Sequence, residues 1–184
     1  MKSKILSTIA LIITLSVNGQ KPILFIGATA HLGNGEVIDN AAISIQNGKF
    51  DLVANASTIR IDPSAFDTIY KVYGKDIYPS FILPNTTLGI TEIDAVRASR
   101  DYKETGGSNP NIRSLIAYNT DSKLARTVRS NGVLIAQVTP RGGLVSGQSS
   151  VMHLEGDNWE DAEIKADDGI HINWPNSYYN TGWW

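Results

Sequence analysis

The residues best placed to do chemistry follow a short apolar run near the middle of the chain. The run 81–83 is typical of a buried strand, and Asn85 and Thr87 come directly after it. In α/β folds the carboxyl ends of such strands carry the polar side chains of the site. Side chains two residues apart on an extended chain point to the same side. We therefore predict that Asn85 and Thr87 face one common space.

Two interpretations of this pair stay open. In the first, the amide and the hydroxyl satisfy each other and nearby backbone groups. In the second, they line a substrate pocket or help to hold a hard cation. An amide oxygen and a hydroxyl are weak ligands for zinc-class ions. The site prediction is therefore substrate-binding residues Asn85 and Thr87, no metal ligand, and catalytic residues unknown.

Other residues with chemical potential give weaker signals. The three histidines, His31, His153 and His171, lie far apart and show no metal-binding spacing. We interpret each as a surface residue or a satisfied core residue. Gly142 and Gly143 could form a backbone anion nest, but the loop lacks the lysine of a phosphate-binding loop. A structural loop is the favoured interpretation.

The segment 74–89 resembles a junction found in the amidohydrolase superfamily, in its imidazolonepropionase-like branch. There, a small β-domain joins the first strand of a (β/α)8 barrel, with the pattern G-K-x-x-x-P-G-x-I-D-x-H-x-H-x-G. The matching residues are Gly74, Lys75, Pro79, Ile82 and Gly89, whereas Ser80 and Leu83 replace a glycine and an aspartate. Asn85 and Thr87 stand where the family has two metal-binding histidines. The framework of the motif is kept and its ligands are absent.

The resemblance implies an enzyme that hydrolyses carbon–nitrogen bonds other than peptide bonds in a small-molecule substrate. It also implies a divalent, zinc-class metal, although the ligands of the first motif are absent. A (β/α)8 barrel needs ~250 residues, and this chain has 184. We therefore expect an inactive N-terminal fragment of a full-length hydrolase. The alternative is a non-catalytic binding protein of amidohydrolase fold that has lost its metal site.

The predicted elements divide the chain at the same junction. Alternating strands and the Asn47-Gly48 hairpin turn predict a small β-sandwich over residues 20–79. Residues 80–184 are predicted to begin the barrel with its first βα units. The expected elements are a helix over about 121–130, a buried strand at 133–138, a Gly-rich loop, a strand at 151–154 and a helix over about 158–168.

Composition limits the remaining possibilities. Residues 1–19 have the positive start, apolar centre and small cleavage-site residues of a signal peptide, which predicts export to the periplasm or beyond. The net charge is −2 with no basic stripe, which argues against nucleic acid as a partner. Cysteine is absent, so no disulfide or thiolate site is possible. The aromatic end, including Trp183 and Trp184, leaves a carbohydrate-binding module as a minor alternative. Oligomeric state is not predicted.

Overall fold

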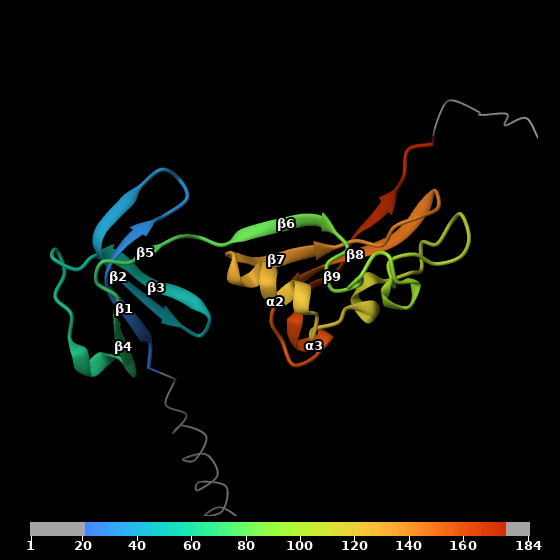
Figure 1. Ribbon diagram of the computed structural model, residues 1–184. Coiled ribbons are helices and arrows are strands. Elements are labelled where there is room, and N and C mark those ends of the chain that lie inside the picture. The colour runs from blue at the N-terminus through green and yellow to red at the C-terminus, as the bar shows by residue number, and fades with distance from the viewer. Residues whose placement is uncertain (1–20, 176–184) are drawn as a thin grey trace, which may run out of the picture. The chain divides into compact units, whose positions relative to one another are not determined.

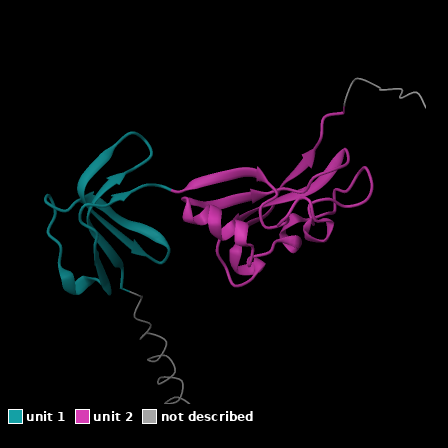
Figure 2. Cartoon of the chain, viewed as in Figure 1, with its two compact units in different colours: residues 1–79 teal, residues 80–184 magenta. Residues whose placement is uncertain are grey.

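The computed structural model describes residues 21–175, so the predicted signal peptide and the terminal tryptophans lie outside the described residues. The chain forms two compact units, Met1–Pro79 and Ser80–Trp184 (Figures 1 and 2). The division falls inside the segment 74–89. Within the described range, no helix is both long and apolar enough to cross a bilayer.

Unit 1 is organised around its first strand. β1 (Ile23–His31) pairs antiparallel with β2 (Val37–Gln46) and parallel with β4 (Thr68–Lys71) and β5 (Asp76–Ile77). β3 (Lys49–Asn55) pairs antiparallel with β2, which gives the order β3-β2-β1-β4 with β5 also on β1. The turn between β2 and β3 is the predicted Asn47-Gly48 hairpin, and both residues have positive φ, 51° and 71°. A 3₁₀ turn, η1 (Pro63–Ala65), precedes β4.

Unit 2 carries one four-stranded sheet in the order β6-β7-β8-β9. β6 (Phe81–Thr86) runs parallel to β7 (Val133–Val138), and the connection between them contains α2 (Lys123–Ser130). β8 (Val145–His153) is antiparallel to β7 and to β9 (Glu163–Ile172). The short helix α3 (Trp159–Ala162) and the 3₁₀ turns η2 (Arg97–Ser99) and η3 (Ser114–Ala117) complete the unit.

The core of unit 2 lies on one face of this sheet. Strand side chains meet side chains from the helices, from η3 and from the segment after β6, and the buried members are Leu88, Ile90, Leu115, Tyr118, Ala125, Ala136, Val138, Met152, Leu154 and Ala162. Gly89 (φ +80°) lies under the Tyr118 ring, where any Cβ would clash. The Tyr118 hydroxyl donates to the backbone carbonyl of His153 (3.0 Å). Tyr118 therefore connects the turn at Gly89, through ring contact, to β8, through its hydrogen bond to His153.

The predicted first βα units of a (β/α)8 barrel are wrong. Repeated βα units would give parallel neighbours throughout, but β8 and β9 return antiparallel. The described residues contain only two α-helices, and both sheets are mixed. The described strands of unit 1 are hydrogen-bonded into one sheet, and the sandwich predicted for residues 20–79 stays a prediction.

One misassigned helix explains much of this error. Capping signals near Asp157 predicted a helix over about 158–168, but α3 ends at Ala162 and β9 begins at Glu163. Asn158 is the cap, and its side chain accepts a hydrogen bond from the Asp161 amide (2.9 Å). Pairing with β8 therefore overrides the local helical preference, as tertiary context often does.

The run 81–83 is not a buried strand as predicted. β6 lies at the edge of the sheet, and Phe81 and Ile82 are 70% and 64% exposed. Only Leu83 packs against the core. The apolar run identified the strand correctly but not its place in the sheet.

Candidate functional site

The end of β6 is shaped by a β-bulge at Pro84 and Asn85. Leu83 pairs with Ala136 and Thr86 with Val138, so two β6 residues oppose the single residue Gln137. Proline has no amide hydrogen to donate to the ladder, which favours a bulge at this position. The Asn85 amide donates instead to Gln137 Oε1 (3.2 Å).

Asn85 takes the left-handed conformation that the bulge requires. Its φ is +50°, a region that asparagine tolerates better than other residues with a Cβ. Arg141 follows β7 and holds Asn85 through both ends of its guanidinium. Nη1 donates to Asn85 Oδ1 (2.7 Å) and Nη2 donates to the Asn85 carbonyl (2.6 Å). Asn85 is exposed and Arg141 is half-buried, so the pair forms a polar rim at the strand ends.

A second set of polar contacts continues from Gln137 across the sheet. Gln137 Nε2 donates to Asp168 Oδ2 (2.8 Å), and Lys165 Nζ pairs with Asp168 Oδ1 (2.7 Å). These hydrogen bonds, first from Lys165 and then from Gln137, hold the pKa of Asp168 below its ordinary value. Residues from β6, β7 and β9 are thus connected by hydrogen bonds along one route.

His171 on β9 belongs to the same electrostatic environment. Burial lowers its pKa, the positive charge of Arg141 lowers it further, and Asp168 opposes both effects. A histidine with a lowered pKa is neutral at pH 7. The strand-end region therefore presents a permanent cation, a neutral imidazole, amide groups and a carboxylate that is already paired.

Thr87 is not joined to Asn85 as the first interpretation expected. Its carbonyl accepts a hydrogen bond from the Ile90 amide (3.1 Å) in the turn after β6, and its side chain is half-buried. No hydrogen bond links Asn85 to Thr87 within residues 21–175. The bulge interrupts the alternation on which the common-space prediction depended, so Asn85 faces Arg141 while Thr87 begins the next turn.

The residues at this strand end do not fit a zinc-class metal. Asn85 Oδ1 already accepts a hydrogen bond from Arg141, and the adjacent guanidinium would repel a divalent cation. Among residues 21–175, no three His, Cys, Asp or Glu side chains come together as a metal site. Asn85 and the groups around it therefore do not fit the zinc-class metal that the resemblance implies.

The sequence did not single out Gln137, Arg141 or Asp168. Gln137 is the one polar residue inside the predicted strand 133–138, and this feature could have marked it as a candidate site residue. Arg141 follows that strand by three residues, which is a common place for functional side chains. Asp168 could not be found, because it was assigned to a helix.

Comparison with known proteins agrees with the fold of an amidohydrolase. No protein-family model matches the sequence, and no curated protein matches it. Among solved structures, an amidohydrolase from Thermotoga maritima MSB8 superposes with a TM-score of 0.73 and 24% identity. The match covers 82% of this chain and 38% of that one, so this chain spans well under half the length of its structural neighbour.

Ochratoxinase from A. niger also matches, with a TM-score of 0.35, 17% identity and coverage of 45% of this chain and 19% of that one. This overlap is too small to add to the argument. The similarity to an amidohydrolase inferred from residues 74–89 therefore has support at the level of fold. It does not distinguish the imidazolonepropionase-like branch.

Proposed function

We propose that this protein is an exported, amidohydrolase-like hydrolase of the imidazolonepropionase-like branch. Its substrates are small molecules with carbon–nitrogen bonds other than peptide bonds, such as cyclic amides and amidines. The observation that carries the proposal is the fold shared with the Thermotoga amidohydrolase over 82% of this chain. Since the match covers 38% of that structure, the activity is proposed for the whole protein, and the 184-residue chain alone is expected to be inactive.

In this proposal the strand ends of unit 2 bind substrate and perform no bond cleavage themselves. Asn85 and Arg141 supply an amide and a cation at the rim, and Thr87 stays a predicted substrate-binding residue on the turn that follows. Amide and guanidinium groups suit the carbonyl and amide atoms of such substrates. Any divalent metal used by the whole protein needs ligands other than Asn85 and Thr87.

A second candidate is a non-catalytic binding protein with an amidohydrolase-like fold. The contact between Arg141 and Asn85 favours it, because it places a cation where the resemblance implies a metal ligand. A protein of this kind would bind the same polar small molecules without turning them over.

The test uses the complete gene product, expressed through its natural stop codon. Purified protein is incubated with a panel of cyclic amides, hydantoins and imidazolones, and ring opening is followed by mass spectrometry. Turnover supports the hydrolase, and Arg141→Gln should then reduce kcat/KM by about tenfold, the loss of one charge-assisted contact. Arg126→Gln on α2 is the matched control and should leave kcat/KM unchanged.

The two candidates separate in the same experiment. Saturable binding of a panel compound without any turnover supports the binding protein. Neither binding nor turnover across the panel contradicts both candidates. Export is checked independently by N-terminal sequencing of protein from the culture medium or periplasm, where cleavage after Gly19 is expected.

A further inference from the structure

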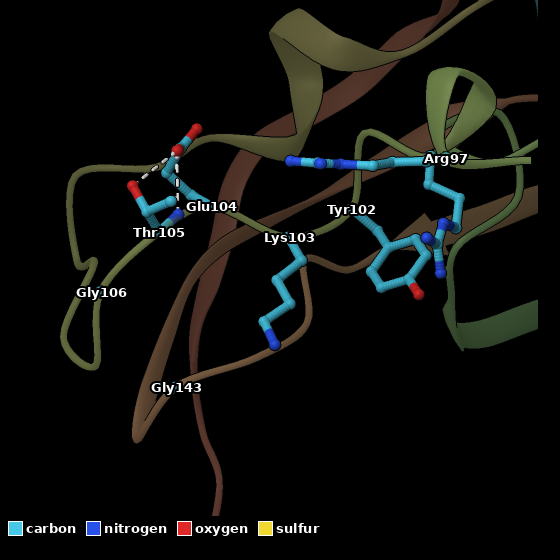
Figure 3. A pocket seen from close by; sticks show the side chains of 8 residues that line it. Arg97, Tyr102, Lys103, Glu104, Thr105, Gly106 and Gly143 are labelled. Carbon is cyan, nitrogen blue, oxygen red and sulfur yellow. Dashed lines mark hydrogen bonds between the residues drawn. The ribbon is translucent and has the colours of Figure 1, made fainter.

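A pocket in unit 2 is lined by three positively charged side chains that take no part in the strand-end contacts. It encloses about 610 Å³ and is formed by the loop around η2, the segment that follows it, and the loop between β7 and β8 (Figure 3). Its lining residues are Arg97, Arg100, Tyr102, Lys103, Glu104, Thr105, Gly106 and Gly143. Three of these eight carry a permanent positive charge.

The three cations of this pocket, Arg97, Arg100 and Lys103, form no ion pair with any acid in the part of the chain that the structure describes, although five ion pairs are present elsewhere in it. Glu104 is the one acid in the lining. Its Oε1 accepts hydrogen bonds from the amide (2.9 Å) and the hydroxyl (3.2 Å) of Thr105, as Figure 3 shows.

Three other acids lie close to these cations along the chain, and none of them lines the pocket: Glu92, Asp94 and Asp101. Glu92 Oε1 is buried and has no hydrogen-bond partner among the described residues. Asp94 accepts a hydrogen bond from the Tyr102 hydroxyl (3.4 Å), and Asp101 lines a neighbouring pocket and not this one. Like charges facing one space repel each other, so their arrangement favours an anion between them. The chain as a whole carries a net charge of −2, which makes this local excess of positive charge more distinct.

The pocket walls are held in place before any ligand arrives. The Arg141 amide donates to the Tyr102 carbonyl (2.7 Å), and the Leu144 amide donates to the Gly107 carbonyl (2.7 Å). These bonds fix the segment 102–107 against the loop between β7 and β8. A preformed site loses less entropy on binding than a flexible one.

Gly142 positions one of the cations directly. Its φ is +89°, and a Cβ at this position would come within 2.7–2.8 Å of the Lys103 side-chain carbons. The Lys103 stem therefore packs on bare backbone, and Figure 3 shows Lys103 extending toward the loop that carries Gly143. The sequence showed a glycine loop without a phosphate-binding lysine. The fold supplies a lysine from a different segment.

We propose that this pocket binds a small polyanion that carries at least two phosphate or carboxylate groups. Two guanidinium groups match the paired oxygens of phosphate and carboxylate, and the ammonium adds a third charge. The Tyr102 ring offers a surface for a flat organic part of the ligand. The proposal is independent of the hydrolase proposal, because it uses none of the strand-end side chains.

The test measures binding of pyrophosphate and of citrate to the purified chain by calorimetry at low salt. At least one should bind saturably and about tenfold more tightly than sulfate, which has a single anionic group. The two probes distinguish phosphate from carboxylate ligands. Equal affinity for sulfate, or no binding of either probe at millimolar concentration, would overturn the proposal.

Two variants separate the pocket from general charge attraction. The triple variant Arg97→Gln, Arg100→Gln and Lys103→Gln should lose about tenfold or more in affinity. The control variant Lys49→Gln, Lys71→Gln and Lys123→Gln removes the same charge from exposed sites outside the pocket, and should change affinity less than about twofold. Equal losses in both would show non-specific attraction and contradict the site.

Gly142→Ala tests the arrangement of the pocket without changing its charge. The added methyl must displace Lys103, so affinity should fall by a few-fold while sulfate binding stays weak. Thermal unfolding of the same sample checks that the chain is folded. Unchanged pyrophosphate and citrate affinity in a folded Gly142→Ala chain would contradict the role of Lys103.

Discussion

The two units of this chain differ in what covers their sheets. In unit 2, α2, α3 and η3 supply side chains to a core that includes fully buried Leu115 and Met152. Among the described residues of unit 1, the buried side chains that form a cluster are small apart from one, namely Ala30, Ala41 and Ile43, and Leu24, Ala28 and Ala42 are also buried. An apolar groove of about 710 Å³ lies on that unit, and its lining includes the 73% exposed Phe50.

This difference shows that strong strand signals do not by themselves produce a buried core. Unit 1 has the clearest local patterns in the sequence, including the hairpin between β2 and β3. Its sheet nevertheless leaves apolar side chains exposed, because burial needs a second layer. Unit 2 has weaker local signals, but its second layer packs against the sheet and buries Leu115 and Met152.

The largest expected change in the free energy of unfolding comes from truncating a buried side chain of unit 2, and an exposed side chain of unit 1 serves for comparison. Leu115→Ala should destabilise unit 2 by about 4 kcal/mol, because it leaves a cavity in a closed core. Phe50→Ala should cost less than about 0.5 kcal/mol, because its ring is already exposed. Hydrogen exchange measured by peptide reports each unit separately. If Phe50→Ala destabilised unit 1 as much as Leu115→Ala destabilises unit 2, the difference between the two cores would be contradicted.

The next effect compares two glycines with positive φ. Gly89→Ala should cost about 3 kcal/mol, because it adds left-handed strain and a clash with Tyr118. Gly48→Ala in the unit 1 hairpin should cost only about 1 kcal/mol of strain, since nothing lies within 4 Å of its added Cβ. Urea unfolding of both variants measures the difference. Equal costs would mean that Gly89 is not packed tightly against Tyr118.

A smaller change in the free energy of unfolding is expected at alkaline pH, where Tyr118 titrates. Burial raises its pKa to about 12 from 10. Between these values the unfolded state releases the proton and the folded state keeps it. Tyr118 therefore contributes stability in full below pH 10 and loses it as the pH rises toward 12.

The loss over this interval is about 2 kcal/mol. Tyr118→Phe removes this pH dependence and costs about 1 kcal/mol at pH 7 through the hydrogen bond to His153. Stability measured from pH 8 to 11 tests both statements. An unchanged alkaline slope in Tyr118→Phe would assign the titration to another group.

The smallest expected effect is a shift in the pKa of His171, which lies near the strand-end residue Arg141 of unit 2. Arg141→Gln should raise the pKa of His171, because it removes the nearby positive charge, while burial still holds that pKa below its ordinary value. Arg126→Gln, which removes a charge paired with Asp121, is the control and should leave His171 unchanged. NMR titration of the imidazole measures both. A pKa that does not move in Arg141→Gln would separate His171 from Arg141.

Local pattern was sufficient for several elements. The apolar run 133–138 became β7, and the hairpin at Asn47-Gly48 formed as predicted. The helix predicted over about 121–130 became α2, with Ser122 as its N-cap. These features depend on neighbours in the sequence, through turn chemistry, periodicity and capping.

The errors come from interactions between distant segments. β8 begins at Val145 inside the predicted Gly-rich loop, and β9 replaces most of a predicted helix. Both follow from pairing of β8 with β9, which no local pattern reveals. The candidate site shows the same limit, since Asn85 could be named from its motif but its partner lies 56 residues away in the chain.

By itself, the sequence determined the Asn47-Gly48 hairpin of unit 1, the likeness of residues 74–89 to an amidohydrolase junction, and the absence of the two histidines of that junction. Those properties depend on adjacent residues and on the conformational preferences of Asn, Gly and Pro. Only the tertiary structure decided that β6 lies at a sheet edge, that Arg141 holds Asn85, and that Arg97, Arg100 and Lys103 share one pocket. The physical reason is that the pairing of strands and the clustering of charged side chains depend on contacts between segments that are far apart in the chain.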